Sequence, residues 1–210
     1  GSFPLLWFAL VEKPQYVDEL PTPKYDRDTL PAPEWRSPWS ALEYHQRVQS
    51  VLDYIRRGDT YQVNLTHRLR TRTPVHDPWQ LFLGMIGDAP PPHAAYLDTG
   101  EWTLCSASPE LFFRKHRDAI ESRPMKGTAA RGRWTEEDRA NADTLADSPK
   151  DRAENVMIVD MVRNDLGRIA VPGTVHVSSL FEVEQYPTVW QMTSTVEAKT
   201  NVGLSEVFRA

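Results

Sequence analysis

The chain has 210 residues, of which 40% are hydrophobic and 25% charged, values typical of a globular domain. Its formal net charge is −5, and it contains no basic run that would suit nucleic acid or an anionic membrane surface. No apolar stretch of the sequence approaches the roughly 20 residues of a membrane-spanning helix. The single cysteine, Cys105, excludes an internal disulfide, and no Cys/His cluster suggests zinc, so we expect a cytoplasmic protein.

The start of the chain contains two stretches of different composition. Residues 3–11 are mostly apolar and lack the basic leader and cleavage site of a signal peptide, so they predict a buried strand. Residues 12–38 are rich in proline and charge, which predicts a surface connector or a flexible insertion.

Start and stop signals predict several helices. Ser40 and Glu43 have the spacing of a capping box, apolar residues then recur at helical spacing, and Gly58 ends the segment. Proline suits the first turn of a helix, so Pro78 and Pro149 support two further helix starts. The predicted helices cover residues 40–58, 77–87, a stretch from 135 onward, and 148–164.

Apolar and polar residues alternate in other segments, which predicts strands. Tyr61–Thr66 is an example, with Tyr61, Val63 and Leu65 on one face. The remaining predicted strands lie around residues 95–97, 102–104, 111–113, 119–121, 175–177 and 189–196. Together the elements predict an α+β domain in which antiparallel β-sheets pack with helices.

Lys126 is the first candidate for chemistry. It follows Pro124, which fixes the local backbone, and precedes Gly127, which permits close approach of the backbone to a ligand. A lysine held there in its neutral form is a nucleophile. The local sequence by itself favours the simpler interpretation of a solvated loop lysine.

Carboxylates supply further candidates. Glu110 begins an aromatic strand and suits a general acid or base, although a single glutamate is more often a surface charge. Asp151 and Glu154 open a predicted helix, where acids complement the helix dipole, and Glu154 alternatively suits a hard cation such as magnesium. Asp160 interrupts an apolar run, so we expect it to be partly buried and paired with an arginine rather than catalytic.

Taken in order, these segments resemble the chorismate-binding enzymes, a family that includes component I of anthranilate synthase and of aminodeoxychorismate synthase. The resemblance covers roughly residues 35–200 and implies the anthranilate-synthase-like chorismate-binding fold. The matching motifs are Tyr61–Thr66, Ala107–Glu110, Pro124–Thr128, Asp151–Asn155, Arg163–Arg168 and Ser179–Val189.

Within this family, the resemblance implies that two positions, those of Gln62 and Lys126, separate the reactions, and Gln191 is a further departure from the anthranilate synthases. Members that add water carry a lysine where this chain has Gln62, and glutamine is not a base near neutral pH, so ammonia is the implied nucleophile. Anthranilate synthases typically have alanine at the position of Lys126 and histidine at that of Gln191. The implied product is therefore 4-amino-4-deoxychorismate, with Lys126 adding covalently to ring carbon 2 as the 4-hydroxyl leaves and ammonia reacting at carbon 4 afterwards.

The resemblance also implies roles for other residues. Glu110 is the general acid for the departing hydroxyl, Glu154 binds the Mg²⁺ that holds the substrate carboxylate, and Gln62, Gly127 and Thr128 contact the substrate. Chorismate is the implied substrate, and a glutamine amidotransferase, as a subunit or a fused domain, is the implied ammonia source.

The family pattern continues beyond Ala210 with a glycine-rich stretch and further metal-binding glutamates. We therefore expect residues 1–210 to be a partial catalytic domain that is inactive alone. Two alternatives remain open: component I of anthranilate synthase, and a non-catalytic scaffold that binds an amidotransferase.

Overall fold

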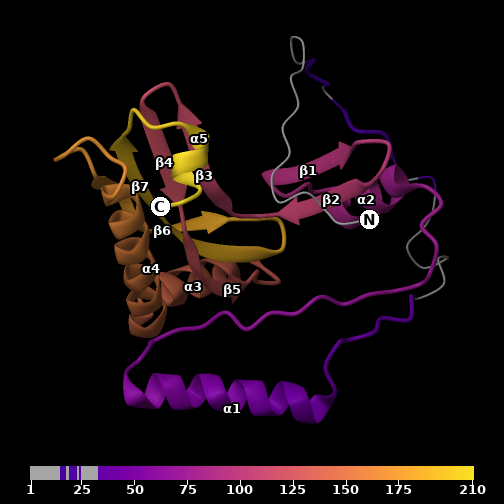
Figure 1. Cartoon of the computed structure of the whole chain (residues 1–210), viewed down its shortest axis with the longest axis horizontal. Helices are drawn as coiled ribbons and strands as arrows, with labels where there is room; N and C mark the ends of the chain where they lie inside the picture. The colour runs from indigo at the N-terminus through magenta and orange to yellow at the C-terminus, as the bar shows by residue number, and fades with distance from the viewer. Residues whose placement is uncertain (1–14, 18, 23, 25–32) are drawn as a thin grey trace. The chain divides into compact units, whose positions relative to one another are not determined.

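The computed structural model describes residues 15–17, 19–22, 24 and 33–210, and the strand expected at residues 3–11 lies outside this set. The chain divides into two compact units, Gly1–Gly84 and Met85–Ala210 (Figure 1). The described residues of the proline-rich stretch 12–38 form no helix or strand, apart from a bridge between Arg36 and Arg70. The absence of helices and strands among these described residues agrees with the predicted surface connector.

Helix α1, Ala41–Arg57, is the main element of the first unit. The capping box is confirmed, because the Ser40 hydroxyl accepts a hydrogen bond from the Glu43 amide and the Glu43 carboxylate accepts one from the Ser40 amide. Gly58 ends the helix in the left-handed conformation, with φ of 78°. Helix α2, Pro78–Ile86, is also confirmed and spans the boundary between the units.

The prediction of a strand at Tyr61–Thr66 is wrong. None of these six residues belongs to a strand. Alternation of apolar and polar residues defines two faces, but a strand also needs a neighbour that satisfies its backbone groups. No described strand pairs with this segment.

The second unit contains two antiparallel sheets. The smaller is the hairpin of β1, His93–Asp98, and β2, Thr103–Ser108. The larger has the order β3-β4-β7-β5, with β6 on the other edge of β7. Its strands are β3 Leu111–His116, β4 Ala119–Arg123, β5 Met125–Ala130, β6 His176–Gln185 and β7 Val189–Lys199. The strands predicted within this unit are confirmed, although β6 extends well beyond the predicted residues 175–177. The simpler interpretation of Lys126 as a solvated loop lysine is wrong, because Lys126 lies in β5.

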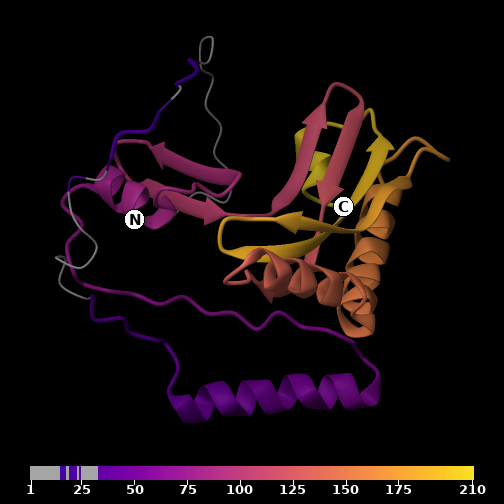
Figure 2. The ribbon, with the colours of Figure 1, turned by 180° about the vertical axis from the view of Figure 1, so that it is seen from behind.

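Helices cover one face of the larger sheet. Helix α3, Thr135–Ala146, and helix α4, Pro149–Gly167, both contact β5 and β7 (Figure 2). A short helix α5, Leu204–Val207, follows β7. The α4 side of the sheet holds the hydrophobic core, whose buried members are Ile120, Val159, Leu166, Val196 and Ala198.

The strand β7 has two different faces because successive side chains point to opposite sides of a strand. The residues with even numbers from Met192 to Ala198 are buried on the side that packs against α4. The residues with odd numbers, Gln191 to Glu197, are polar, and three of them line an open pocket. The central strand therefore separates a packed core from a polar surface.

Asp160 differs from its prediction. Its side chain is 63% exposed on α4 and pairs with Arg163 at 2.9 Å. The arginine partner is confirmed, but the expected burial is wrong, because α4 turns this position away from the sheet although apolar residues flank it in sequence. Among the helices of the described residues, none has the combination of length and apolar character that crossing a membrane requires.

Candidate active site

Lys126 lies in an irregularity of strand β5. Met125 pairs with Thr193 of β7 and Thr128 pairs with Gln191, so Lys126 and Gly127 together face the single residue Met192. This arrangement is a β-bulge, which bends a strand and redirects side chains. Lys126 is half-buried, and its side chain has no hydrogen-bond or ion-pair partner among the described residues. A half-buried amine without a fixed partner remains available to a ligand.

Gly127 is required at this bulge for two reasons. Its φ is +93°, a region that side-chain-bearing residues rarely adopt. A Cβ atom at this position would lie 2.9 Å from Cβ of Asp151 and 3.1 Å from Cδ1 of Leu145. The sequence predicts a close approach of this backbone to a ligand, whereas the structure shows a close approach to helices α3 and α4 of the same unit.

Glu110 lies in the turn between β2 and β3, with an exposed side chain. Its Oε1 accepts a hydrogen bond from the backbone amide of Met125 at 2.9 Å. The carboxylate is therefore held against the residue that immediately precedes Lys126. Two residues that are distant from each other in the sequence, Glu110 and Lys126, are brought to the same end of β5.

Thr128 continues the same strand. Its hydroxyl donates a hydrogen bond of 2.9 Å to Oε1 of Gln191, its partner in β7. Gln191 belongs to the polar face of β7, together with Thr193 and Thr195. The threonine hydroxyl and the glutamine amide thus form a polar pair beside the bulge.

Glu154 projects from the first part of α4 and is 37% exposed. Its nearest cation is Lys150, at 3.9 Å along the helix. Asp151, in the first turn of the same helix, lies close to Gly127, and its carboxylate accepts a hydrogen bond from the Ser148 hydroxyl at 2.5 Å. Within the part of the chain that the structure describes, no three His, Cys, Asp or Glu side chains form a metal-binding group.

Gln62 belongs to the first unit, whereas the other five candidate residues belong to the second. The amide oxygen of Gln62 is buried and has no hydrogen-bond partner among the described residues. A buried acceptor without a donor is costly, so it suits a site that a ligand completes.

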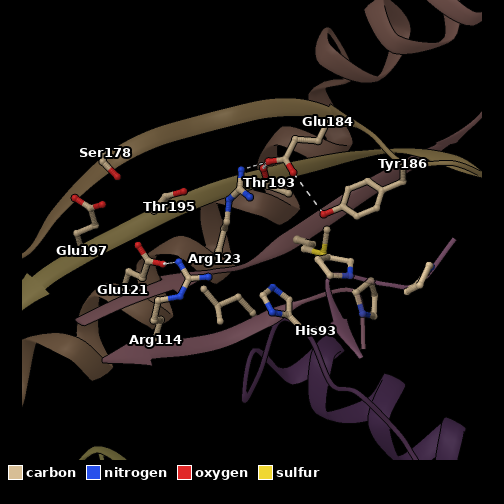
Figure 3. Close-up of a pocket in the computed structure, with 15 residues that line it drawn as sticks. His93, Arg114, Glu121, Arg123, Ser178, Glu184, Tyr186, Thr193, Thr195 and Glu197 are labelled. Atoms are coloured by element: carbon tan, nitrogen blue, oxygen red, sulfur yellow. Dashed lines mark hydrogen bonds and ion pairs between the residues drawn. The ribbon is translucent and has the colours of Figure 1, made fainter. Parts of the chain in front are cut away.

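The polar face of the sheet contains a pocket of about 670 Å³ (Figure 3). None of the residues predicted from the sequence lines it, although Pro109 and Met125, the neighbours of Glu110 and Lys126, do. The pocket also includes residues from β1, β3, β4, β6 and β7. Those with polar side chains are His93, Arg114, Glu121, Arg123, Ser178, Glu184, Tyr186, Thr193, Thr195 and Glu197.

Charge pairs organise this pocket (Figure 3). The Arg123 guanidinium pairs with Glu184, and Arg114 pairs with Glu121 at 2.6 Å. Glu184 also accepts hydrogen bonds from the Thr193 hydroxyl at 2.6 Å and from the Tyr186 hydroxyl at 3.4 Å. Burial and the Glu184 carboxylate raise the pKa of Tyr186 above its ordinary value, which keeps the phenol protonated as a donor.

The sequence contains only a weak signal for these pocket residues. Thr193, Thr195 and Glu197 alternate with apolar residues in β7, which marks one polar face of that strand. Arg123 and Glu184 are 61 positions apart, and no spacing rule predicts their pairing. Only the sheet order brings them together.

The sequence matches known proteins. A sequence model of the family "chorismate binding enzyme" matches residues 7–210. The chain is 46% identical over 168 residues to a probable chloroplastic aminodeoxychorismate synthase of Oryza sativa subsp. japonica, covering 79% of this chain and 19% of that protein. It is 43% identical over 165 residues to aminodeoxychorismate synthase component 1 of Klebsiella aerogenes, covering 79% and 36%.

Anthranilate synthases are similar as well. Component 1 of the Thermus thermophilus enzyme is 42% identical over 163 residues, which covers 78% of this chain and 35% of that protein. The crystal structure of anthranilate synthase component I from Streptococcus pneumoniae TIGR4 superposes with a TM-score of 0.72 at 26% identity, covering 84% of this chain and 39% of that one.

These relatives are much longer than the chain, which spans 19% of the Oryza protein and 36% of the Klebsiella protein. The family match nevertheless includes nearly the whole sequence, and the structural match confirms the expected fold. The resemblance inferred from the ordered motifs is thereby confirmed, and the chain belongs to the chorismate binding enzyme family.

Proposed function

We propose that this chain supplies the nucleophile, the general acid and one metal ligand of an enzyme that converts chorismate and ammonia to 4-amino-4-deoxychorismate and water. The observation that carries the proposal is the hydrogen bond from the Met125 amide to Glu110, which holds a carboxylate next to the Lys126 bulge. A nucleophile and an acid at one strand end suit a substitution in which a poor leaving group needs a proton.

The reaction has two balanced steps. In the first, the neutral amine of Lys126 bonds to ring carbon 2, both conjugated ring double bonds shift by one position, and the bond between carbon 4 and its hydroxyl breaks. Glu110 gives that hydroxyl a proton, so water leaves. In the second step ammonia bonds to carbon 4, the two ring double bonds return to their original positions, and the bond between carbon 2 and Lys126 breaks. The surplus proton of the ammonium returns to the Glu110 carboxylate, which regenerates both groups.

Glu154 is the residue of this chain that suits Mg²⁺. Its carboxylate is partly exposed, and its contact with Lys150 is loose at 3.9 Å. Magnesium in enzymes is commonly held by one or two carboxylates, with water and substrate oxygens completing the shell, so a single glutamate fits part of such a site. When bound, the ion supplies positive charge that holds the substrate carboxylate.

Gln62 supports ammonia as the nucleophile. The family resemblance places a lysine at this position in members that add water, and the buried amide oxygen of Gln62, which has no donor among the described residues, is left to accept a hydrogen bond from a ligand. An amide does not deprotonate water, which disfavours hydroxylation. We further propose that a glutamine amidotransferase, as a subunit or a fused domain, supplies the ammonia.

Anthranilate formation is the second candidate, favoured by the identity of 42% to the Thermus thermophilus enzyme. Lys126 and the Thr128–Gln191 pair argue against it, because the family resemblance associates anthranilate formation with alanine and histidine at positions 126 and 191. A non-catalytic scaffold would not need an acid held beside a lysine.

The test uses a chimera in which this chain replaces the matching segment of Klebsiella aerogenes aminodeoxychorismate synthase component 1. The chimera and the 210-residue chain alone are each incubated with chorismate, ammonium and Mg²⁺, and products are identified by mass spectrometry. We expect aminodeoxychorismate from the chimera and no turnover by the chain alone. Anthranilate with pyruvate from the chimera would contradict the proposed product. Turnover by the 210-residue chain alone would refute the expectation that this chain is a partial catalytic domain that is inactive by itself.

A further inference from the structure

Asn155 follows Glu154 in α4 and is completely buried, with 0% of its surface exposed. A buried amide is costly unless it is hydrogen-bonded. Its Oδ1 accepts a bond of 2.5 Å from the Ser194 hydroxyl, and its Nδ2 faces the backbone oxygen of Met192 at 3.5 Å. The helix is therefore fixed to the central strand β7 by a polar contact within an otherwise apolar layer.

Ser194 is also completely buried, and both its hydroxyl and its backbone amide are hydrogen-bonded. While its hydroxyl donates to Asn155, it accepts a bond of 3.1 Å from the backbone amide of Phe181, a residue with φ of +60° at an irregularity of β6. Its own amide donates to the backbone oxygen of Pro124 at 3.1 Å. Ser194 thus connects α4, β6 and the residue that precedes β5.

A continuous path results from these bonds. It runs from Asn155 to Ser194, then to Pro124, and continues from the Met125 amide to the carboxylate of Glu110. Lys126 is the next residue along β5. The path therefore passes through or beside the three groups to which the proposed reaction assigns roles: Glu154, Lys126 and Glu110.

We infer that Asn155 and Ser194 are positioning residues, which hold the Lys126 bulge and the Glu110 carboxylate in a fixed relation to helix α4. This inference rests on the proposed function and adds two residues to it. Neither residue touches the reacting atoms in this scheme. Small displacements of reacting groups lower turnover strongly, so a pair that fixes the bulge affects kcat without binding substrate.

The first test measures amide hydrogen exchange by NMR in the 210-residue chain and in its Ser194→Ala and Asn155→Leu variants. The matched control is Asn164→Leu, because Asn164 lies on the exposed surface of the same helix. We expect exchange of the Met125 amide to rise about tenfold in both variants and to stay unchanged in the control. A purely local structural role would raise exchange at Phe181 or in α4 and leave Met125 protected.

The second test measures steady-state kinetics of the same variants in the chimera. We expect kcat to fall about 100-fold while KM for chorismate changes less than about threefold. Ser194→Thr, which keeps the hydroxyl, is expected to retain most of the activity. If the Asn155→Leu variant does not fold, the Ser194→Ala variant, which removes the same hydrogen bond, carries the test.

The outcomes separate the two proposals. Unchanged Met125 exchange in folded Ser194 and Asn155 variants overturns the positioning inference, whatever the kinetics. A chimera with the native sequence that produces no aminodeoxychorismate contradicts the proposed function, while the exchange measurement still decides whether the path controls the bulge. An equal loss of activity in Ser194→Thr and Ser194→Ala also counts against the hydroxyl-mediated path.

Discussion

The Glu110 carboxylate accepts a hydrogen bond of 2.9 Å from the Met125 backbone amide, although the two residues are 15 positions apart. This hydrogen bond joins the turn between β2 and β3 to the start of β5, immediately before Lys126. The contact is made by one oxygen of an exposed carboxylate, which leaves the second oxygen able to carry a proton to a substrate.

Glu110→Gln separates the structural role from the chemical one. The amide oxygen can still accept the Met125 bond, so we expect thermal unfolding of the 210-residue chain to change little. The amide cannot donate an acidic proton, so aminodeoxychorismate formation by the chimera should fall by a factor of about 10²–10⁴. Glu110→Ala removes both the acceptor for the Met125 amide and the acid, so it should lower thermal stability as well as activity. Full activity of the glutamine variant would rule out Glu110 as the acid.

Lys126→Ala removes the proposed nucleophile. We expect aminodeoxychorismate formation by the chimera to be abolished, because Lys126 carries the only amine of β5. Lys199→Ala is the matched control, since Lys199 is a 66% exposed lysine on β7. Product analysis by mass spectrometry checks both. Unchanged product formation in the Lys126 variant would show that the nucleophile assignment is wrong.

Gly127→Ala tests the bulge. The variant must adopt φ of +93° and also press a methyl group against Asp151 and Leu145, so we expect a loss of about 3 kcal/mol in unfolding free energy. Gly173→Ala has φ of +79° but open space around the added atom, so it should cost only about 1–2 kcal/mol. Urea unfolding of both variants compares the two costs. Equal losses would mean that the contacts with Asp151 and Leu145 contribute nothing to the cost.

The contacts of Asp138 lead us to expect that the stability of the chain depends on pH in the acid range. Its carboxylate accepts hydrogen bonds from Arg131 at 2.6 and 2.8 Å and from the Gly132 amide at 2.7 Å, which hold the pKa of Asp138 well below its ordinary value of 3.8. Because the pKa of Asp138 is lower in the folded chain than in the unfolded chain, ionised Asp138 stabilises the fold. This stabilisation is complete at pH values above the unfolded pKa and declines as the pH falls towards the folded pKa.

The measurement compares urea midpoints of the native chain and Asp138→Asn. We expect the native chain to be more stable at pH 7 and the difference to shrink between about pH 4 and pH 2. The other carboxylates titrate in both proteins and cancel in the comparison. A difference that stays constant over this range would contradict the assigned cause.

Much of the fold follows from local sequence signals. Ser40, Glu43 and Gly58 define the ends of α1 because capping depends on residues a few positions apart. The segment Tyr61–Thr66 shows the limit of such signals, since a strand exists only where another strand pairs with it. Asp160 shows a second limit, because sequence neighbours do not reveal which side of a helix faces the sheet.

The sequence by itself determined the family, the α+β class and the candidates Lys126, Glu110 and Glu154, because ordered motifs and local periodicity are properties of the chain. Only the tertiary structure decided that Lys126 lies in a β-bulge, that Gly127 packs against α4, and that Asn155 and Ser194 form a buried pair. These features depend on the pairing of β5 with β7, strands about 60 residues apart, and on α4 covering them. Contacts at such separations arise from sheet register, which no local pattern specifies.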